Sequence, residues 1–168
     1  MNAFLRRASR AALAVALLAL NSCGYSSKPL YNSAYRTIAV PIFANKTFRR
    51  EWEFRLTEAL DKAIESRTPY KVVSQDKADT VLSGEIVNIT EDVLSDRYGT
   101  VLPRESQLTV AVNFIWKDRG GRVLVERNNF NRSATEIPQI GERVVDAEQL
   151  AVERLASAIV DQLQNGDW

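Results

Sequence analysis

Very few side chains in this sequence belong to the types that carry out chemistry. Its 168 residues include no histidine, one methionine and one cysteine, Cys23. Nucleophilic catalysis by Ser-His-Asp or Cys-His groups requires an imidazole, and zinc sites are usually built from histidine or cysteine. The folded part of the chain therefore lacks the residues for either kind of site.

Carboxylate pairs are the remaining candidates for acid–base catalysis, which needs two such groups in a shared, partly buried site. Two pairs are close in sequence, Glu91 with Asp92 and Asp76 with Asp79. Both lie at the ends of expected strands or loops among other charges, which is typical of a solvated surface. No phosphate-binding pattern follows Gly120-Gly121, and no ladder of acidic residues has EF-hand spacing. We therefore expect a protein that is not an enzyme and holds no metal ion or cofactor.

Two groups of basic residues are candidates for binding phosphate. Arg97 and Arg104 flank one expected loop, and Lys117, Arg119 and Arg122 surround the next turn. If the strands between them are neighbours, the two groups lie at opposite ends of a sheet. Guanidinium groups match phosphate oxygens bidentately, so these residues are candidates for contacts with lipid phosphates. Strand tips are also commonly charged for solubility, and both interpretations stay open.

The overall charge excludes general attraction to nucleic acid. The chain has 22 basic and 21 acidic residues, a net charge of +1. Three of the basic residues, Arg6, Arg7 and Arg10, precede Cys23, so removal of residues 1–22 leaves 22 − 3 = 19 basic residues and a charge of −2. Binding that depends on neutralising a phosphate backbone needs a positive surface, so we expect no nucleic-acid partner.

The first 22 residues have the pattern of a secretory signal peptide. A basic start is followed by the apolar run from Ala11 to Leu20. Ten residues are too few to cross a hydrocarbon core of about 30 Å, which needs about 20. Leu20-Asn21-Ser22-Cys23 then resembles the bacterial lipobox, in which the cysteine is lipidated and becomes the new N-terminus.

Lipidation of Cys23 would decide where the protein is located. Several acyl chains anchor durably, because each buried CH₂ contributes about 0.8 kcal/mol and one chain alone binds only marginally. Gly24 occupies the place of the aspartate that is associated with retention in the inner membrane. We therefore expect a lipid-anchored protein on the periplasmic face of the outer membrane. The alternative is an ordinary signal peptide that ends by chance at a cysteine.

The mature chain divides into a short tether and one domain. Residues 23–35 contain the lipidated cysteine and a segment rich in Gly, Ser, Asn and Tyr, which predicts a tether. Two interpretations stay open for its tyrosines, Tyr25, Tyr31 and Tyr35. Either they pack on a partner or lie in the lipid headgroup layer, or they have no specific role in the tether. Residues 36–168 are expected to form a single α/β-sandwich domain, which is long enough for a hydrophobic core.

Hydrophobic periodicity predicts five strands and two helices in this domain. The strands are expected at residues 36–43, 70–74, 78–94, 108–116 and 123–133, and the helices at 48–66, with Thr47 as its N-cap, and 141–164. In the third strand Leu82, Gly84 and Ile86 share a face opposite a second group, Val81, Val87 and Ile89. Trp52 and Trp116 fall on apolar stripes and are expected in the core.

These elements predict an α+β fold in the order β-α-β-β-β-β-α. Each helix has one continuous apolar stripe, and both stripes are buried if the two helices pack on one face of a mostly antiparallel sheet. Asp118-Arg119-Gly120-Gly121 predicts a hairpin turn between the last two strands.

Several motifs together resemble the lipopolysaccharide-assembly lipoprotein (LptE) family. Cys23-Gly24-Tyr25 is followed by Thr37–Phe43, TIAVPIF, and then by Asn45-Lys46-Thr47. Downstream are Tyr70–Val73, YKVV, and Ala78–Ile86, ADTVLSGEI. The similarity extends over residues 23–165, and related exported lipoproteins share the pattern of the opening strand.

The resemblance implies a binding protein and not an enzyme. Members of the family occupy the lumen of the outer-membrane β-barrel LptD as a plug, assist its assembly and contact lipopolysaccharide on its way to the cell surface. The implied partners are therefore an LptD-like barrel, lipopolysaccharide and the membrane that holds the acyl anchor. The candidate lipopolysaccharide contacts, which match no family motif, are Arg97, Arg104, Lys117, Arg119 and Arg122.

Two other functions stay open at this point. One is a lipoprotein adaptor or activator of a periplasmic enzyme such as a peptidoglycan synthase, since such proteins open with a similar strand and helix. The other is a periplasmic enzyme that uses carboxylates alone, which would require a cleft with Asp or Glu of raised pKa.

Overall fold

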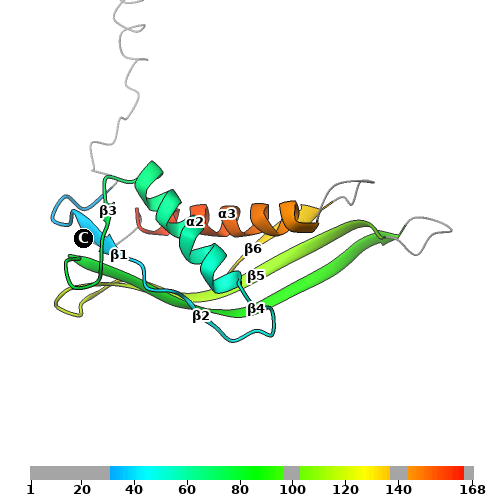
Figure 1. Cartoon of the computed structure of the whole chain (residues 1–168), viewed down its shortest axis with the longest axis horizontal. Helices are drawn as coiled ribbons and strands as arrows, with labels where there is room; N and C mark the ends of the chain where they lie inside the picture. The colour runs from blue at the N-terminus through cyan, green and yellow to red at the C-terminus, as the bar shows by residue number, and fades with distance from the viewer. Residues whose placement is uncertain (1–30, 97–102, 137–143, 165–168) are drawn as a thin grey trace, which may run out of the picture.

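The computed structural model describes residues 31–96, 103–136 and 144–164, which form six strands and two helices. In chain order these are β1 (Thr37–Ala39), β2 (Ala44–Asn45), α2 (Trp52–Arg67), β3 (Lys71–Val72), β4 (Thr80–Asp96), β5 (Pro103–Asp118), β6 (Val123–Glu136) and α3 (Val144–Gln162). Both helices lie on one face of a single twisted sheet, as expected for the α+β class (Figure 1). Within the described residues, the opposite face of the sheet carries no helix.

The sheet is mixed, so the expectation of a mostly antiparallel sheet in the order β-α-β-β-β-β-α is wrong. The strands are arranged β3-β1-β4-β5-β6, with β2 also paired to β4. β1 is parallel to both β3 and β4, and β2 is parallel to β4, whereas β4–β5 and β5–β6 are antiparallel. The parallel pair β1–β3 follows from the crossover through α2, because strands joined by a helix on one face run in the same direction.

The expected first strand at residues 36–43 is divided into two. β1 ends at Ala39, and the chain pairs again at Ala44. Pro41 has no N–H to donate to a ladder, which accounts for the break. The chain order in the described part is therefore β-β-α-β-β-β-β-α.

The core forms between the helices and the sheet, as the periodicity predicts. Trp52 and Trp116 are 3% and 0% exposed, which confirms both as core residues. The apolar stripes of α2 and α3 and the helix-facing side chains of β4 and β5 pack around them. These side chains include Leu56, Leu60, Ile64, Leu82, Ile86, Val112, Phe114, Leu155 and Ile159.

A β-bulge changes which side chains of β4 face the core. The partners along β5 shift between Ile86 and Asn88, so Val87 is the extra residue. Ile89 therefore packs against the core on the same side as Ile86. The expectation that Ile89 shares the opposite face with Val81 is wrong, because a one-residue shift moves every later side chain to the other face.

The start of α2 also differs from the expectation. The helix begins at Trp52 and not at residue 48, and its N-cap is Glu51, which has a left-handed φ of 73° and no side-chain capping bond. Thr47 is not the cap. Its hydroxyl instead accepts a hydrogen bond from the Arg49 N–H at 3.3 Å within the preceding turn.

Asp61 on α2 is a destabilising feature that this fold tolerates. Its Oδ1 is buried without a hydrogen-bond partner in the described part of the chain. Burial raises the pKa of Asp61, and the nearby charges of Glu65 and Glu58 raise it further. The charged form is therefore disfavoured in the folded state.

Asp61→Asn is expected to stabilise the protein at pH 7 by about 0.5 kcal/mol, a figure that is small because Asp61 is only half-buried. Since the folded pKa lies above the unfolded one, the cost is absent below the unfolded pKa, grows between the two pKa values, and is fully present above the folded pKa. Urea unfolding at pH 3 and pH 7 measures this. A gain that is equal at both pH values would contradict the explanation.

Candidate functional site

The β5–β6 hairpin tip, residues 117–122, brings three of the five candidate basic residues together. The turn is closed by the Asp118 N–H, which donates to the Arg122 carbonyl at 2.9 Å, and by the Gly121 N–H, which donates to the Asp118 carbonyl at 3.0 Å. Gly121 has a φ of 85°, which favours glycine. The expected hairpin turn is therefore confirmed, and Lys117, Arg119 and Arg122 lie at one end of the sheet.

Arg122 is largely engaged within the hairpin tip. Its Nε lies 3.2 Å from Asp118 Oδ2, and its Nη2 donates to the Tyr35 hydroxyl at 2.7 Å. Backbone donation from the Arg122 N–H lowers the pKa of Asp118, and the charge of the Arg122 guanidinium lowers it further. Arg122 therefore presents a largely neutralised charge to any ligand.

Arg119 and Lys117 are the less neutralised cations of the hairpin tip. The Arg119 Nη2 donates to the Asp76 carbonyl at 2.6 Å, and its backbone N–H donates to the Asp79 carbonyl at 2.9 Å. Within the described part of the chain, neither Lys117 nor Arg119 lies within 4.0 Å of a carboxylate oxygen. These two are therefore the cations of the hairpin tip that have no carboxylate partner in the described part of the chain.

The other two candidate residues are Arg97 and Arg104. Arg97 lies outside the described residues, and Arg104 is within β5 but its side chain lies outside them. The register pairs Thr80 with Asp118 at one end of β4 and Asp96 with Pro103 at the other. Sixteen residues of β5 span about 50 Å, so Arg104, near the start of β5, lies far along the strand from the hairpin tip.

The acidic residues weighed as catalytic pairs have other roles in the structure. The Asp79 carboxylate accepts the backbone N–H groups of Arg36 and Thr37 at 2.9 and 3.1 Å, and these bonds lower its pKa. Glu91 pairs with Arg49 at 3.2 Å. The lowered pKa of Asp79 is opposite to the raised pKa that an acid–base catalyst needs.

Two tyrosines assigned to the tether pack on the domain itself. The Tyr31 hydroxyl donates to the Arg67 carbonyl at 2.7 Å, and its ring meets the edge of Tyr70 at a centroid distance of 5.8 Å. The Tyr35 ring lies 6.4 Å from the ring of Trp116. The chain is therefore fixed to the domain from Tyr31 onward, beside the C-terminal end of α2. Tyr25 lies outside the described residues.

A row of polar contacts crosses the helix-free face of the sheet. Lys46 Nζ lies 2.7 Å from Glu85 Oε2, and Asn113 donates from Nδ2 to Glu85 Oε1 at 2.9 Å. The Asn129 N–H donates to Asn113 Oδ1 at 2.8 Å, at a bulge where Asn129 has a φ of 52°. Beside this row is an open hollow of about 360 Å³, whose lining includes Ser83 and Glu126. Sequence reasoning missed this row, because its members are far apart along the chain and have no common spacing.

Neither helix in the described part of the chain has both the length and the apolar character needed to cross a membrane. No group of three His, Cys, Asp or Glu side chains there could hold a metal ion.

Comparison with known proteins identifies a family and a fold. Residues 35–165 match the family model described as "LptE: Lipopolysaccharide-assembly". No curated protein matches the chain in sequence.

Solved structures share the fold at low sequence identity. A hypothetical protein from Chlamydia trachomatis is 11% identical with a TM-score of 0.53, over 78% of this chain and 96% of that one. A minor lipoprotein from Acinetobacter baumannii is 16% identical with a TM-score of 0.51, over 79% of this chain and 94% of that one. A protein from Xanthomonas campestris is 14% identical with a TM-score of 0.51, over 80% of this chain and 90% of that one.

Proposed function

Because the chain belongs to the LptE family of lipopolysaccharide-assembly proteins, we propose that it is a lipoprotein that plugs an LptD-type β-barrel. It is anchored through Cys23 to the outer membrane on the periplasmic side, assists assembly of the barrel and helps deliver lipopolysaccharide to the cell surface. It acts by binding and not as an enzyme. The observation that carries this proposal is the family match over residues 35–165.

The shape of the sheet supports a role as a plug. β4 and β5 are 17 and 16 residues long, about three times the usual length of a strand. Each of these strands is about 50 Å long, whereas α2 and α3 span about 24 and 29 Å. The paired strands β4 and β5 therefore extend beyond the helices at one end (Figure 1). The interior of an outer-membrane barrel is polar, which suits the polar row on the helix-free face.

The proposal is tested by co-expressing the full chain with the LptD-type barrel of the same genome and purifying it in a mild detergent. Retention of the barrel in a stable complex is the expected result. Purification with a peptidoglycan synthase in place of the barrel would favour the adaptor function and contradict the plug.

The hairpin tip is the proposed contact for lipopolysaccharide phosphate. The double variant Lys117→Ala with Arg119→Ala is expected to weaken binding of purified lipopolysaccharide about tenfold, because charge-assisted hydrogen bonds to phosphate are lost. Arg127→Ala with Arg132→Ala on β6 removes the same charge elsewhere and serves as the control. Equal weakening by both double variants, measured by calorimetry, would show an effect of net charge and contradict a local contact. Arg97, Arg104 and Arg122 remain candidates of the same kind.

A further inference from the structure

The end of the sheet at which the chain joins the domain carries an excess of positive charge. We call this surface the tether end and define it as residues 31–37, 68–79 and 117–122. It contains six cations and three carboxylates, although the chain after residue 22 has a net charge of −2. The six cations are Arg36, Lys71, Lys77, Lys117, Arg119 and Arg122. Positive charge is therefore concentrated at one end of a chain that is acidic as a whole.

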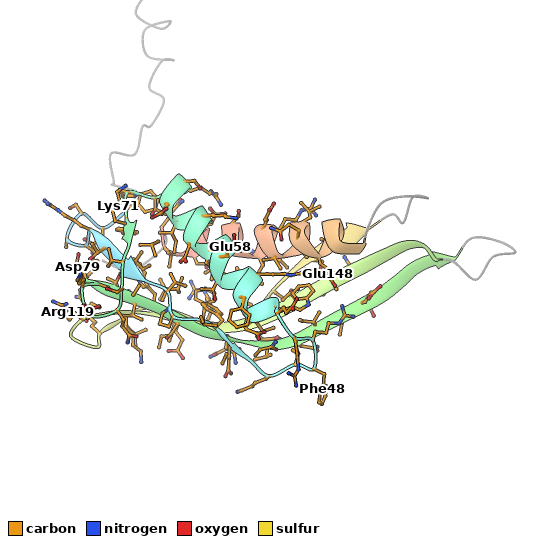
Figure 2. The ribbon with its side chains drawn as sticks, viewed as in Figure 1. Phe48, Glu58, Lys71, Asp79, Arg119 and Glu148 are labelled. Carbon is orange, nitrogen blue, oxygen red and sulfur yellow. The ribbon has the colours of Figure 1, made fainter. Side chains whose placement is uncertain are left out.

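Hydrogen bonds hold the three segments of the tether end side by side. The Lys71 N–H donates to the Arg36 carbonyl, and the Arg119 N–H donates to the Asp79 carbonyl, both at 2.9 Å. The Asp79 carboxylate in turn accepts the Arg36 N–H at 2.9 Å. Figure 2 shows Lys71, Asp79 and Arg119 at one end of the molecule, away from Phe48. The cations of the tether end therefore form one surface.

Five of the six cations have no carboxylate partner in the described part of the chain. The sixth, Arg122, is paired with Asp118 at 3.2 Å. The Asp79 carboxylate is occupied by backbone N–H groups. Four of the five unpaired cations are exposed, namely Arg36, Lys71, Lys77 and Arg119. An exposed cation that no carboxylate neutralises retains its attraction for an anionic surface.

The turn between β2 and α2, residues 46–51, has the opposite arrangement. Its Phe48 is 105% exposed, but Lys46 pairs with Glu85 at 2.7 Å and Arg49 pairs with Glu91 at 3.2 Å. Nine cations with described side chains form no ion pair there, and five of them lie at the tether end. The other four are spread over the turn, β6 and α3, namely Arg50, Arg127, Arg132 and Arg154.

The segment that follows the proposed anchor is fixed to this same end. The Tyr31 hydroxyl donates to the Arg67 carbonyl at 2.7 Å, and the Tyr35 hydroxyl accepts a hydrogen bond from Arg122 at 2.7 Å. Seven residues separate Cys23 from Tyr31, and this length of chain spans at most about 29 Å. An anchor at Cys23 therefore keeps the tether end near the membrane. Charge, and not the length of the tether, then decides which surface of the domain meets the lipid.

We propose that the tether end docks on the anionic phosphate groups of the phospholipids in the leaflet that holds the acyl anchor. This inference rests on the anchoring through Cys23 in the proposed function, and it does not depend on the barrel. Each Lys or Arg close to an anionic lipid surface strengthens binding about fivefold, and a basic surface beside acyl chains is a second membrane signal. Docking orients the domain so that the hairpin tip lies at the headgroup layer and residues 46–51 face away from it.

The test measures contact between single positions of the domain and the bilayer. Cys23 is the only cysteine, so its acylation leaves an introduced cysteine as the only free thiol. Ser74→Cys at the tether end and Phe48→Cys in the turn replace exposed residues, and each is labelled with a fluorophore in the full-length acylated chain. The labelled proteins are added to phosphatidylcholine vesicles that contain phosphatidylglycerol and a lipid with a nitroxide quencher at its headgroup.

Quenching at position 74 is expected to exceed quenching at position 48 by about threefold or more. It is also expected to be lost in 1 M salt, where electrostatic attraction is screened beyond about 3 Å. Equal quenching at the two positions, or quenching at position 74 that persists in 1 M salt, would overturn docking through charge.

A pair of double variants tests whether the unpaired cations are the cause. In the protein labelled at position 74, Lys71→Gln with Lys77→Gln is expected to lower the ratio of docked to undocked protein about 30-fold. Arg127→Gln with Arg154→Gln removes the same charge from β6 and α3 and is expected to change the ratio less than about threefold. Equal loss in both would show an effect of net charge and overturn a local docking surface. Unchanged unfolding midpoints show that neither effect is one of folding.

Failure of this inference is distinguishable from failure of the proposed function. If the protein is acylated but position 74 does not contact the vesicles, the inference alone is overturned. If the wild-type protein is not acylated, the anchoring and this inference are both overturned. Contact at position 74 that requires lipopolysaccharide in the vesicles and is absent with phosphatidylglycerol would assign the tether end to lipopolysaccharide and overturn docking on phospholipid. No barrel is present in these experiments, so failure of the plug function leaves their outcome unchanged.

Discussion

Gly84→Val is expected to lower the free energy of unfolding by about 3 kcal/mol or more. Gly84 faces the helices between Leu82 and Ile86, and the ring of Phe43 lies directly against it. A Cβ at this position would overlap the Phe43 ring and the backbone oxygen of Asn113. Phe43 is 1% exposed and the oxygen belongs to β5, which is paired with β4 on one side and β6 on the other, so neither has room to move.

Urea unfolding followed by tryptophan fluorescence measures the effect, since Trp52 and Trp116 are buried. Gly120→Ala is the control, because Gly120 is an exposed turn residue whose added Cβ would approach only the side chain of Asp118, at 3.2 Å. Gly120→Ala is expected to change the free energy of unfolding by less than about 0.5 kcal/mol. Equal midpoints for the two variants would show that Phe43 is not held against Gly84.

The same contact links the core to the exposed turn. Phe43 immediately precedes β2, whose Ala44 pairs with Glu85 of β4. A variant that expels Phe43 therefore also releases β2 and residues 46–51 from the sheet.

Cys23→Ala is expected to abolish attachment of the protein to the membrane. Each buried CH₂ of an acyl chain contributes about 0.8 kcal/mol, so loss of several chains removes nearly all of the membrane affinity. Wild-type protein is expected to incorporate a fatty-acid analogue and to fractionate with the outer membrane, whereas the variant does neither. Labelling followed by fractionation measures both properties.

Ser22→Ala is the control for this change, because it keeps a small residue before Cys23 and leaves the thiol in place. It is expected to be labelled like wild-type protein. A wild-type protein that is unlabelled and indistinguishable from Cys23→Ala would contradict lipidation and the location proposed from it.

Long periodic segments were predictable from sequence, whereas short strands and their directions were not. The stripe of α2 and the alternation of β5 repeat over many residues, so burial of Leu60 or Val112 follows from spacing alone. β2 and β3 are two residues each and carry no period. Their parallel pairing is set by tertiary packing around the α2 crossover, and the bulge at Val87 leaves no mark in the pattern.

The candidate site was predictable only in part. The glycine pair predicts the hairpin that gathers Lys117, Arg119 and Arg122, but it does not reveal that Arg122 also donates a hydrogen bond to Tyr35, which is 87 residues away in sequence. The sequence predicts Phe48 at the start of a helix, because its neighbours in sequence do not distinguish an exposed aromatic residue in a turn from one on a buried helix face. Its exposure depends on the helix starting four residues later, at Trp52.

The most direct test of the central claim is a cryo-electron microscopy structure of the full chain bound to the LptD-type barrel of the same genome. The account predicts one copy of this domain within the lumen of the barrel. A domain bound outside the lumen, or a particle that contains a periplasmic enzyme and no barrel, would contradict it.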